Sequence, residues 1–351
     1  MNTETRKRLP DILLAWYDQT ARVLPWRDDP TPYRVWVSEI MLQQTRVDAV
    51  MPYYENFMSH VPTLRDLAEI PLEKLLKLWE GLGYYSRAEN LKKAAMRIME
   101  EHEGELPVRY EDWIRLPGIG PYTAGAIASI ACGQKTTAVD GNVLRVFSRL
   151  TADVRDITDA GTRKDIGRLV ALSLPDTRTG DYNQALMELG ATVCLPSGAP
   201  RCSICPVSSL CEAFHQGNMQ SYPVKPAKKK RIIQKKTVLI IECEGKFALR
   251  QRPVGGLLPG LWEFPVLEGC LSVRECRDML REQGTEIQGI LPLDGARHVF
   301  THLEWHMTAY HILVKEQYGP RDWIWASREQ IRDDHAIASA LKTYTGHVVA
   351  R

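Results

Sequence analysis

The feature that most constrains this chain is a group of four cysteines within eighteen positions, spaced Cys194-x7-Cys202-x2-Cys205-x5-Cys211. Four thiolates in one short loop suit either a [4Fe–4S] cluster or a tetrahedral zinc ion, and spacing alone does not choose between them. The N-terminal segment has the pattern of an amphipathic helix rather than of a secretory signal. We therefore expect a reducing compartment and a metal or cluster site, not a disulfide framework.

Length and composition set the broad class. The chain has 351 residues, 44% of them hydrophobic, with 45 Lys+Arg against 43 Asp+Glu and a net charge of +2. This is the composition of a globular protein, and the length favours two domains. Since the net charge is small, any nucleic-acid surface must be local. No apolar run approaches the ~20 residues that span a bilayer, so we expect no membrane segment. Because no organelle signal is visible, the bacterial cytoplasm is the simplest location, and we expect a monomer.

The hydrophobic pattern divides the chain into three parts. Apolar residues recur at helical spacing up to about residue 215, which predicts an all-α domain over residues 1–216. Residues 217–236 are rich in lysine and lack that period, which indicates a basic linker that is either a solvated spacer or a phosphate-facing arm. Residues 237–351 read as an α+β domain, with strands at 237–243, 247–250 and 303–314 and helices at 272–283 and 327–344.

A glycine-bearing turn stands in the middle of the helical part, in Leu116-Pro117-Gly118-Ile119-Gly120-Pro121-Tyr122. Two glycines two residues apart, followed by renewed helical spacing, are typical of a helix–hairpin–helix turn. Such a turn presents backbone N–H groups at a helix N-terminus, where they can hold a DNA phosphate without reading sequence. Pro-Gly-x-Gly alone is compatible with any turn between helices, but the longer string favours phosphate binding at Gly118 and Gly120.

Two acidic residues are candidates for chemistry. On a helix Glu39 has mostly apolar neighbours, which should raise its pKa and keep it protonated; it could instead be a buried structural glutamate paired with Arg27 or Arg46. Asp140 directly precedes a predicted helix, so it is either a simple N-cap or the ionised partner of Glu39. Cleavage of a glycosidic bond needs one carboxyl of each kind.

These pieces, in this order, resemble the helix–hairpin–helix DNA glycosylases with an iron–sulfur loop, and most closely the adenine DNA glycosylases of the MutY family. The resemblance extends over nearly the whole chain. It rests on the hairpin above and on four further strings, namely Leu24-Pro25-Trp26-Arg27, Val37-Ser38-Glu39-Ile40-Met41-Leu42-Gln43-Gln44-Thr45, Gly81-Leu82-Gly83-Tyr84-Tyr85-Ser86-Arg87-Ala88 and Val139-Asp140-Gly141-Asn142-Val143.

The resemblance implies a monofunctional enzyme that removes adenine mispaired with 8-oxoguanine or guanine after flipping it out of the duplex. Glu39 would protonate N7 of the adenine, and Asp140 would stabilise the oxocarbenium sugar or bond to it. The remaining implied site residues are Asn142 and Tyr122 in the catalytic site, Trp26, Arg27 and Gln184 around adenine, Gln44, Thr45, Leu82 and Tyr84 at the duplex and the oxidised guanine, and Cys194, Cys202, Cys205 and Cys211 around one [4Fe–4S] cluster.

Tyr122 separates two branches of these glycosylases. Bifunctional members, similar to endonuclease III, carry a lysine at this position and form an imine that leads to strand cleavage. A phenol cannot form that imine, so we predict base release without efficient nicking. The resemblance also implies an iron–sulfur module made of residues 1–30 and 139–216 around a six-helix module at about 31–138. The rival classes are a bifunctional glycosylase for damaged pyrimidines and a DNA-scanning protein without catalysis.

The C-terminal part resembles the MutT-like (Nudix) domain of this family through Gly255-Gly256-Leu257-Leu258-Pro259-Gly260-Leu261-Trp262-Glu263-Phe264-Pro265. Met279 stands where a Mg²⁺-binding acid would be needed, so we predict a recognition module and not a second enzyme. The residues implied to read 8-oxoguanine are His298, Phe300, Thr301 and His302, on a strand or hairpin tip rather than at a metal.

The chain departs from the family pattern at two places. The first cysteine gap is seven residues instead of the usual six, and Thr301 replaces the usual serine. The later cysteine gaps match the family, so we expect the cluster to be retained. Of the adjacent tyrosines Tyr84 and Tyr85, we expect Tyr85 to be the one packed inward.

Overall fold

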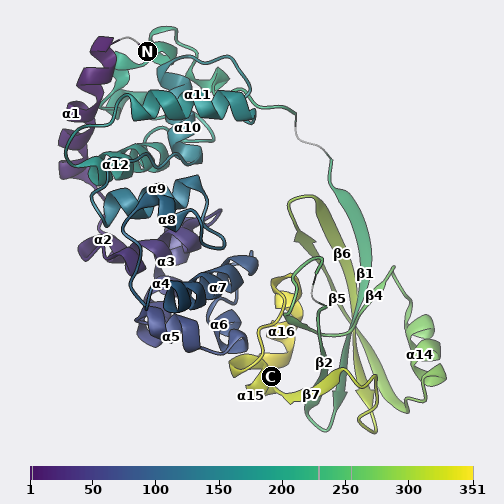
Figure 1. Cartoon of the computed structure of the whole chain (residues 1–351). Helices are drawn as coiled ribbons and strands as arrows, with labels where there is room; N and C mark the ends of the chain where they lie inside the picture. The colour runs from purple at the N-terminus through teal and green to yellow at the C-terminus, as the bar shows by residue number, and fades with distance from the viewer. Residues whose placement is uncertain (2, 228–229, 254, 351) are drawn as a thin grey trace. The chain divides into compact units, whose positions relative to one another are not determined.

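The computed structural model describes residues 1, 3–227, 230–253 and 255–350, and these form two compact units (Figure 1). One unit consists of Met1–Glu69 and Asn90–Ala227, the other of Ile70–Glu89 and Lys228–Arg351. Lys228 and Lys229 of the predicted linker lie outside the described residues. The boundaries proposed from the sequence, at residues 216 and 236, remain predictions.

The hydrophobic period predicts helices up to about residue 215, and the structure confirms them and adds a short helical turn that ends at Ser221. No helix in the described ranges is both long and apolar enough to cross a membrane. The helices are α1 (Thr3–Thr20), α2 (Pro25–Asp28), α3 (Pro32–Leu42), α4 (Val47–His60), α5 (Leu64–Glu69), α6 (Leu72–Leu78), α7 (Ser86–Glu101), α8 (Tyr110–Trp113), α9 (Pro121–Ile130), α10 (Gly141–Leu150), α11 (Ala160–Ala171), α12 (Thr179–Thr192), η1 (Cys202–Ile204), η2 (Ser208–Leu210), α13 (Glu212–His215) and η3 (Met219–Ser221).

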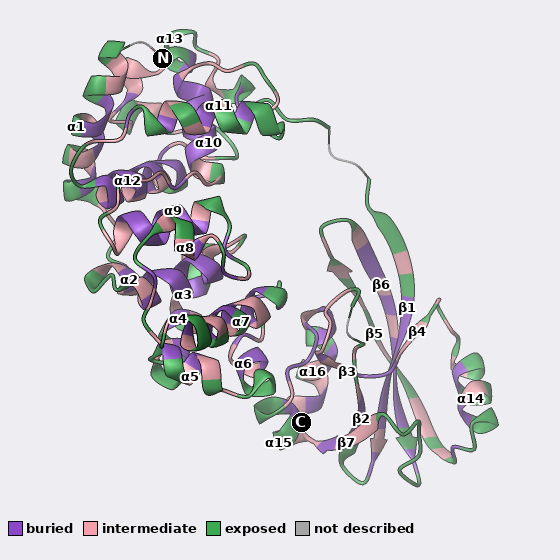
Figure 2. Cartoon of the chain, viewed as in Figure 1, coloured by how far each residue is buried: buried purple, intermediate pink, exposed green. Residues whose placement is uncertain are grey.

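Most residues of helices α3, α9, α10 and α12 are buried in the helical unit (Figure 2). Helix α10 packs against α12, and α12 also contacts α1 and α9. Helix α9 approaches the following chain so closely that a Cβ on Gly125 would lie 1.9 Å from the carbonyl oxygen of Thr137. This tight packing holds the N-terminus of α10 against α9, because Thr137 lies three residues before the Asp140 cap of α10.

The C-terminal part is an α+β fold, as predicted. One mixed sheet has the order β3-β2-β1-β6-β5, with β4 paired to β1 and β7 to β2. Its elements are β1 (Ile232–Cys243), β2 (Lys246–Gln251), β3 (Trp262–Glu263), β4 (Val266–Glu268), α14 (Val273–Glu282), β5 (Ile287–Val299), β6 (Leu303–Val314), β7 (Trp323–Ser327), α15 (Arg328–Asp333), η4 (Ser339–Leu341) and α16 (Lys342–Val349).

Strand β1 lies inside this sheet and is buried on both faces. Val238 and Ile240 belong to a core that includes residues of α15 and α16, whereas Leu239 and Ile241 belong to one that includes α14. Successive side chains of a strand point to opposite faces, so one strand serves two cores. The central strand therefore anchors helices on both sides of the sheet.

Most elements predicted for the C-terminal part are confirmed, but the prediction of one continuous helix at 327–344 is wrong. Strand β6 has the predicted bounds, and β1 begins earlier than residue 237 because Ile232 already pairs with Leu303. The helix expected at 327–344 is interrupted between α15 and α16. The reason is that this segment pairs with the backbone of Trp262: the backbone N–H of Trp262 donates to Ala336 O (2.9 Å), and its carbonyl accepts from Ala338 N (2.9 Å).

Candidate active site

A cavity of about 490 Å³ in the helical unit holds the predicted catalytic residues. This volume falls in the ~300–1,000 Å³ range of small-molecule sites. The cavity collects side chains from α2, α3, α9, α12 and the start of α10, which are far apart in the sequence. The predicted residues among those that line it are Trp26, Arg27, Glu39, Thr45, Tyr122, Asp140, Asn142 and Gln184.

Glu39 lies on the buried face of α3 and is only 5% exposed. The Tyr122 hydroxyl donates a hydrogen bond to its Oε2 atom. The pKa of Glu39 is raised to about 7, mainly by burial and to a smaller extent by the charge of Asp140, while the hydrogen bond from Tyr122 and the charge of Arg27 act in the opposite direction. Its carboxyl therefore carries a proton through the range just below neutral pH.

Asp140 is the N-cap of α10, and it also lines the cavity. Its carboxylate accepts from Val143 N at 2.7 Å and from Asn142 Nδ2 at 2.6 Å. The capping role predicted from the sequence is thus confirmed, and it coexists with a place at the cavity. Burial raises the pKa of Asp140, contrary to the expected effect of a helix N-terminus alone, although the hydrogen bonds from Val143 and Asn142 favour the ionised form.

Tyr122 and Asn142 are both tied into the site. The Tyr122 hydroxyl also lies 3.3 Å from Met187 Sδ, and burial raises the pKa of this tyrosine well above its usual value. Asn142 accepts from Arg145 Nη2 at 2.7 Å. The same arginine donates to Gly190 O and, through Nε, to Cys194 O (both 2.8 Å).

Glu188 is a cavity residue that the sequence did not single out. It is 1% exposed and accepts from Arg22 Nε at 2.6 Å and from Arg27 Nη2 at 2.9 Å. Arg27 also donates to Gln184 Oε1 at 3.1 Å. Two of the predicted adenine-pocket residues, Arg27 and Gln184, therefore belong to one network around the buried Glu188. Nothing in the local sequence around Glu188 marks it, because its partners come from a segment about 160 residues earlier.

The predicted hairpin connects α8 to α9. Gly118 has a φ of +75°, and a Cβ there would lie 2.6 Å from Asn90 Cβ, so only glycine fits without strain. Gly120 is the N-cap of α9, with Pro121 in the first turn, and a Cβ at Gly120 would meet nothing within 4 Å. The open space in front of the first turn is what a phosphate approaching the backbone N–H groups requires.

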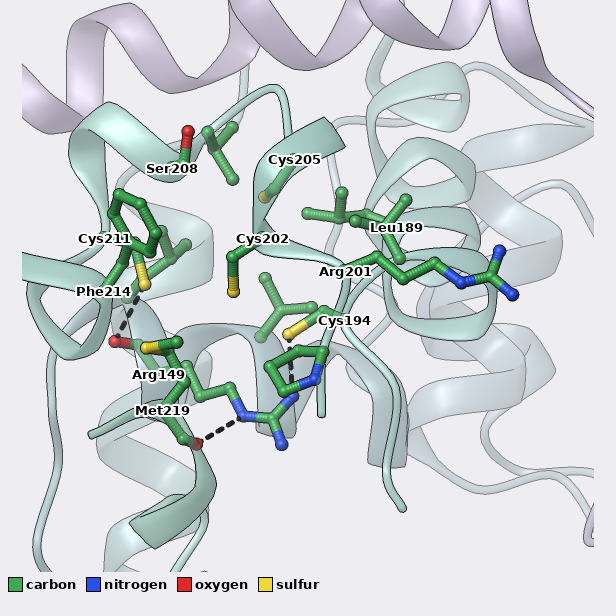
Figure 3. A pocket seen from close by; sticks show the side chains of 15 residues that line it. Arg149, Leu189, Cys194, Arg201, Cys202, Cys205, Ser208, Cys211, Phe214 and Met219 are labelled. Atoms are coloured by element: carbon green, nitrogen blue, oxygen red, sulfur yellow. Dashed lines mark hydrogen bonds between the residues drawn. The ribbon is translucent and has the colours of Figure 1, made fainter. Parts of the chain in front are cut away.

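The four clustered cysteines line a second cavity, where their sulfur atoms gather (Figure 3). None is in a disulfide. Arg149 Nη1 donates to Cys194 Sγ at 3.2 Å, and Cys211 Sγ donates to Arg149 O at 3.4 Å. In the part of the chain that the structure describes, no group of three or more His, Cys, Asp or Glu side chains stands close enough to hold a single metal ion.

The residues predicted to read the oxidised guanine lie on the hairpin between β5 and β6. The ring of Phe300 makes edge contacts with His298 (4.6 Å between centroids) and Trp305 (5.1 Å). Thr301 and His302 are exposed in the turn between the paired strands, so the predicted hairpin tip is confirmed.

The segment that contains Leu82 and Tyr84 belongs to the same unit as this hairpin. Tyr84 is 46% exposed, whereas Tyr85 is 2% exposed, which confirms the expected orientation of the two tyrosines, and Leu82 is 7% exposed. The hydroxyls of Tyr84 and Thr301 are 3.3 Å apart. Gln44 lies in the other unit and is exposed, with a φ of +59°.

Comparison with known proteins gives the family. Residues 37–171 match the HhH-GPD superfamily of base excision DNA repair proteins, and residues 237–345 match the NUDIX domain. The human adenine DNA glycosylase is 36% identical over 94% of this chain and 72% of its own, and that of Buchnera aphidicola (subsp. Baizongia pistaciae) is 34% identical over 87% and 86%.

Among solved structures, a thermostable thymine-DNA glycosylase superposes with a TM-score of 0.56 at 28% identity, over 61% of this chain and 98% of its own. These matches confirm the expected order of a helix–hairpin–helix glycosylase domain and a Nudix-like domain. The chain belongs to the adenine DNA glycosylase (MutY) family of base excision repair enzymes.

Proposed function

We propose that this enzyme hydrolyses the N-glycosidic bond of adenine paired with 8-oxoguanine or guanine in duplex DNA. The observation that carries the proposal is that Glu39 and Asp140 line one cavity with different hydrogen-bond partners. Glu39 is in contact with one hydroxyl, whereas Asp140 accepts two N–H donors. The first setting favours a neutral acid, and the second holds an anion better.

In this mechanism the flipped adenine enters the cavity, and Glu39 transfers its proton to N7 of the base. The C1′–N9 bond breaks, and the electron pair leaves with the adenine. Asp140 stabilises the positive sugar, water adds to C1′, and the carboxylate of Glu39 takes up the proton that this water releases. Asn142 keeps the Asp140 carboxylate oriented through its 2.6 Å hydrogen bond.

The site favours hydrolysis without strand cleavage. Tyr122 occupies the position beside Glu39 at which an imine-forming lysine would be needed, and among the described residues that line the cavity there is no lysine. Trp26, Arg27 and Gln184 surround the base, with Arg27 fixed by Glu188 and Gln184. Glu188 is therefore added to the residues that shape the adenine pocket.

Cys194, Cys202, Cys205 and Cys211 would hold one [4Fe–4S] cluster. The donor set fits, because all four sulfurs border one cavity beside Arg149. Burial raises the pKa of Cys205 to about 12 and also raises that of Cys211. Four thiolates at this place therefore need positively charged iron to balance them. The cluster would tie together the loop of residues 194–211, which Arg149 of α10 contacts at Cys194 and Cys211, and no chemical step is assigned to it.

The remaining assignments concern DNA. The backbone at Gly118 and Gly120 would bind a phosphate, and Gln44, Thr45, Leu82 and Tyr84 would contact the duplex and the oxidised guanine. His298, Phe300, Thr301 and His302 would form the reading hairpin. The partner is duplex DNA, bound by a monomer.

The test is single-turnover adenine release from duplexes with A opposite 8-oxoguanine, guanine or thymine. Glu39→Gln should lower the rate by about 10²–10⁴-fold, the usual contribution of a general acid, without loss of mismatch binding. Glu55→Gln, an exposed glutamate on the neighbouring helix α4, is the matched control and should leave the rate unchanged. A Glu39→Gln enzyme as fast as the wild type would overturn the assignment.

A further inference from the structure

Outside the active site, a set of charged side chains on and just after helix α6 is hydrogen-bonded to Trp262 of β3, to the last turn of α15 and to the segment that follows α15. These are Glu73, Lys77 and Glu80, and their partners are backbone or side-chain atoms of Trp262 and of residues 331–337. All belong to the unit formed by Ile70–Glu89 and Lys228–Arg351. None is among the residues assigned above to DNA or chemistry.

Lys77 is the centre of this set. Its half-buried ammonium group donates to Ile331 O at 3.1 Å, to His335 O at 3.0 Å and to Glu80 Oε2 at 2.6 Å. Ile331 lies in the last turn of α15, where backbone carbonyls lack helical partners and a cation is favoured. One lysine thus satisfies all three of its donors with fixed acceptors, two of them on the backbone.

The two glutamates complete the contact. Glu80 Oε1 accepts from Ile337 N at 2.8 Å, so the Lys77–Glu80 pair satisfies both donors and acceptors of the facing backbone. Glu73 Oε1 accepts from Trp262 Nε1 at 2.8 Å and lies 3.2 Å from His335 Nδ1. These bonds also explain why residues 334–338 do not continue the helix α15.

The turn that follows Glu80 is rigid. Leu82 N donates to Trp79 O at 3.1 Å, Trp79 Nε1 donates to Gly83 O at 3.3 Å, and Arg87 Nη2 donates to the carbonyls of Leu82 (3.2 Å) and Gly83 (3.1 Å). A displacement of residues 77–80 is therefore carried to Tyr84. Tyr84 is in turn the residue whose hydroxyl lies 3.3 Å from Thr301.

We propose that Lys77 and Glu80 are positioning residues that set the preference for 8-oxoguanine, by fixing Tyr84 beside the Thr301 turn. This inference rests on the proposed function of the site. We call the hydrogen bonds of Lys77 and Glu80 to the backbone of Ile331, His335 and Ile337 the Lys77–Glu80 dock. This dock holds the two halves of the 8-oxoguanine contact, one from residues 82–84 and one from residues 298–302, in a single arrangement. It touches neither the base nor the reacting atoms.

The test measures single-turnover rate and half-saturating enzyme concentration for duplexes with A opposite 8-oxoguanine or guanine. Lys77→Ala should raise the half-saturating concentration for the 8-oxoguanine duplex by about tenfold, which corresponds to the loss of roughly one hydrogen bond in the 8-oxoguanine contact when Tyr84 is displaced. It should not change that for the guanine duplex, nor the rate at saturation. Lys74→Ala, on the exposed side of the same helix, is the matched control and should change neither.

A double-mutant cycle with Thr301→Val separates positioning from a general loss of structure. If Lys77 acts through the Tyr84–Thr301 contact, Lys77→Ala in the Thr301→Val background should cause no further loss of preference. Losses that multiply independently, or a Lys77→Ala enzyme that keeps the full preference, would overturn the proposal.

Hydrogen exchange gives a readout that is independent of activity. Glu80→Ala should speed exchange of the Ile337 amide, whose acceptor it removes, and unchanged protection would also count against the dock. If the wild-type chain releases no adenine from any duplex, the proposed function fails and this inference falls with it. If the wild type releases adenine normally but Lys77→Ala leaves the preference for 8-oxoguanine unchanged, only this inference fails.

Discussion

Replacing Glu39 with glutamine should stabilise the protein at alkaline pH, because the buried carboxyl of Glu39 is ionised there and its charge lowers the free energy of unfolding. Burial raises the pKa of Glu39 from its ordinary 4.5 to about 7 in the folded chain. Below pH 4.5 the group is protonated in both states and costs nothing. As the pH rises from 4.5 through 7 stability is lost, by about 3 kcal/mol in total, and above 7 the loss stays constant. Glutamine stays neutral, and its amide oxygen can still accept from Tyr122.

The advantage of Glu39→Gln over the wild type should therefore be below about 1 kcal/mol at pH 5 and about 3 kcal/mol at pH 8. The assay is urea unfolding of both proteins at the two pH values, followed by circular dichroism at the helix band. Equal differences at pH 5 and pH 8 would refute the reasoning, since they would show that Glu39 does not titrate in this range.

Glu188→Gln is the matched control, since Glu188 is another buried glutamate of the same cavity. Burial raises its pKa, but the hydrogen bonds and charges of Arg22 and Arg27 outweigh this and hold the pKa below the ordinary value. Removing its charge leaves two arginines without their partner. The variant should lose about 3–5 kcal/mol at pH 8, the opposite sign to Glu39→Gln.

Three further predictions concern other parts of the chain. Tyr122→Phe removes the hydrogen bond that lowers the pKa of Glu39, the proposed general acid, so the alkaline limb of the single-turnover pH profile should move to higher pH; an unmoved limb would argue that another group controls it. Cys202→Ala should abolish the visible absorbance of an iron–sulfur chromophore and lower the bound iron, measured by metal analysis; full iron content in this variant would exclude the proposed ligand set. Gly125→Ala should destabilise the helical unit by at least about 1–3 kcal/mol, since its Cβ would lie 1.9 Å from a backbone carbonyl oxygen. Gly167→Ala lies in helix α11 with open space around its Cβ and should stabilise the protein by about 0.5–1 kcal/mol. Thermal unfolding of the two variants checks both signs.

The regular elements could be predicted from the sequence because their signals are local. The apolar period of the first 215 residues and the alternation in β6 arise from residues a few positions apart. The N-cap role of Asp140 is equally local, as it depends on the amide of Val143 three residues later. Where the prediction failed, between α15 and α16, the decisive hydrogen bonds came from Trp262, more than seventy residues away.

By itself, the sequence determined the class of the chain, the cysteine loop and the identities of the two carboxyls, since each depends on residue type and short spacing. Only the tertiary structure decided that Glu39 and Asp140 line one cavity, that Glu188 holds Arg22 and Arg27, and that Lys77 meets the backbone of residues 331–335. Burial and partners, which set a pKa or fix a side chain, come from segments brought together by packing. Such contacts leave no pattern at the position where they act.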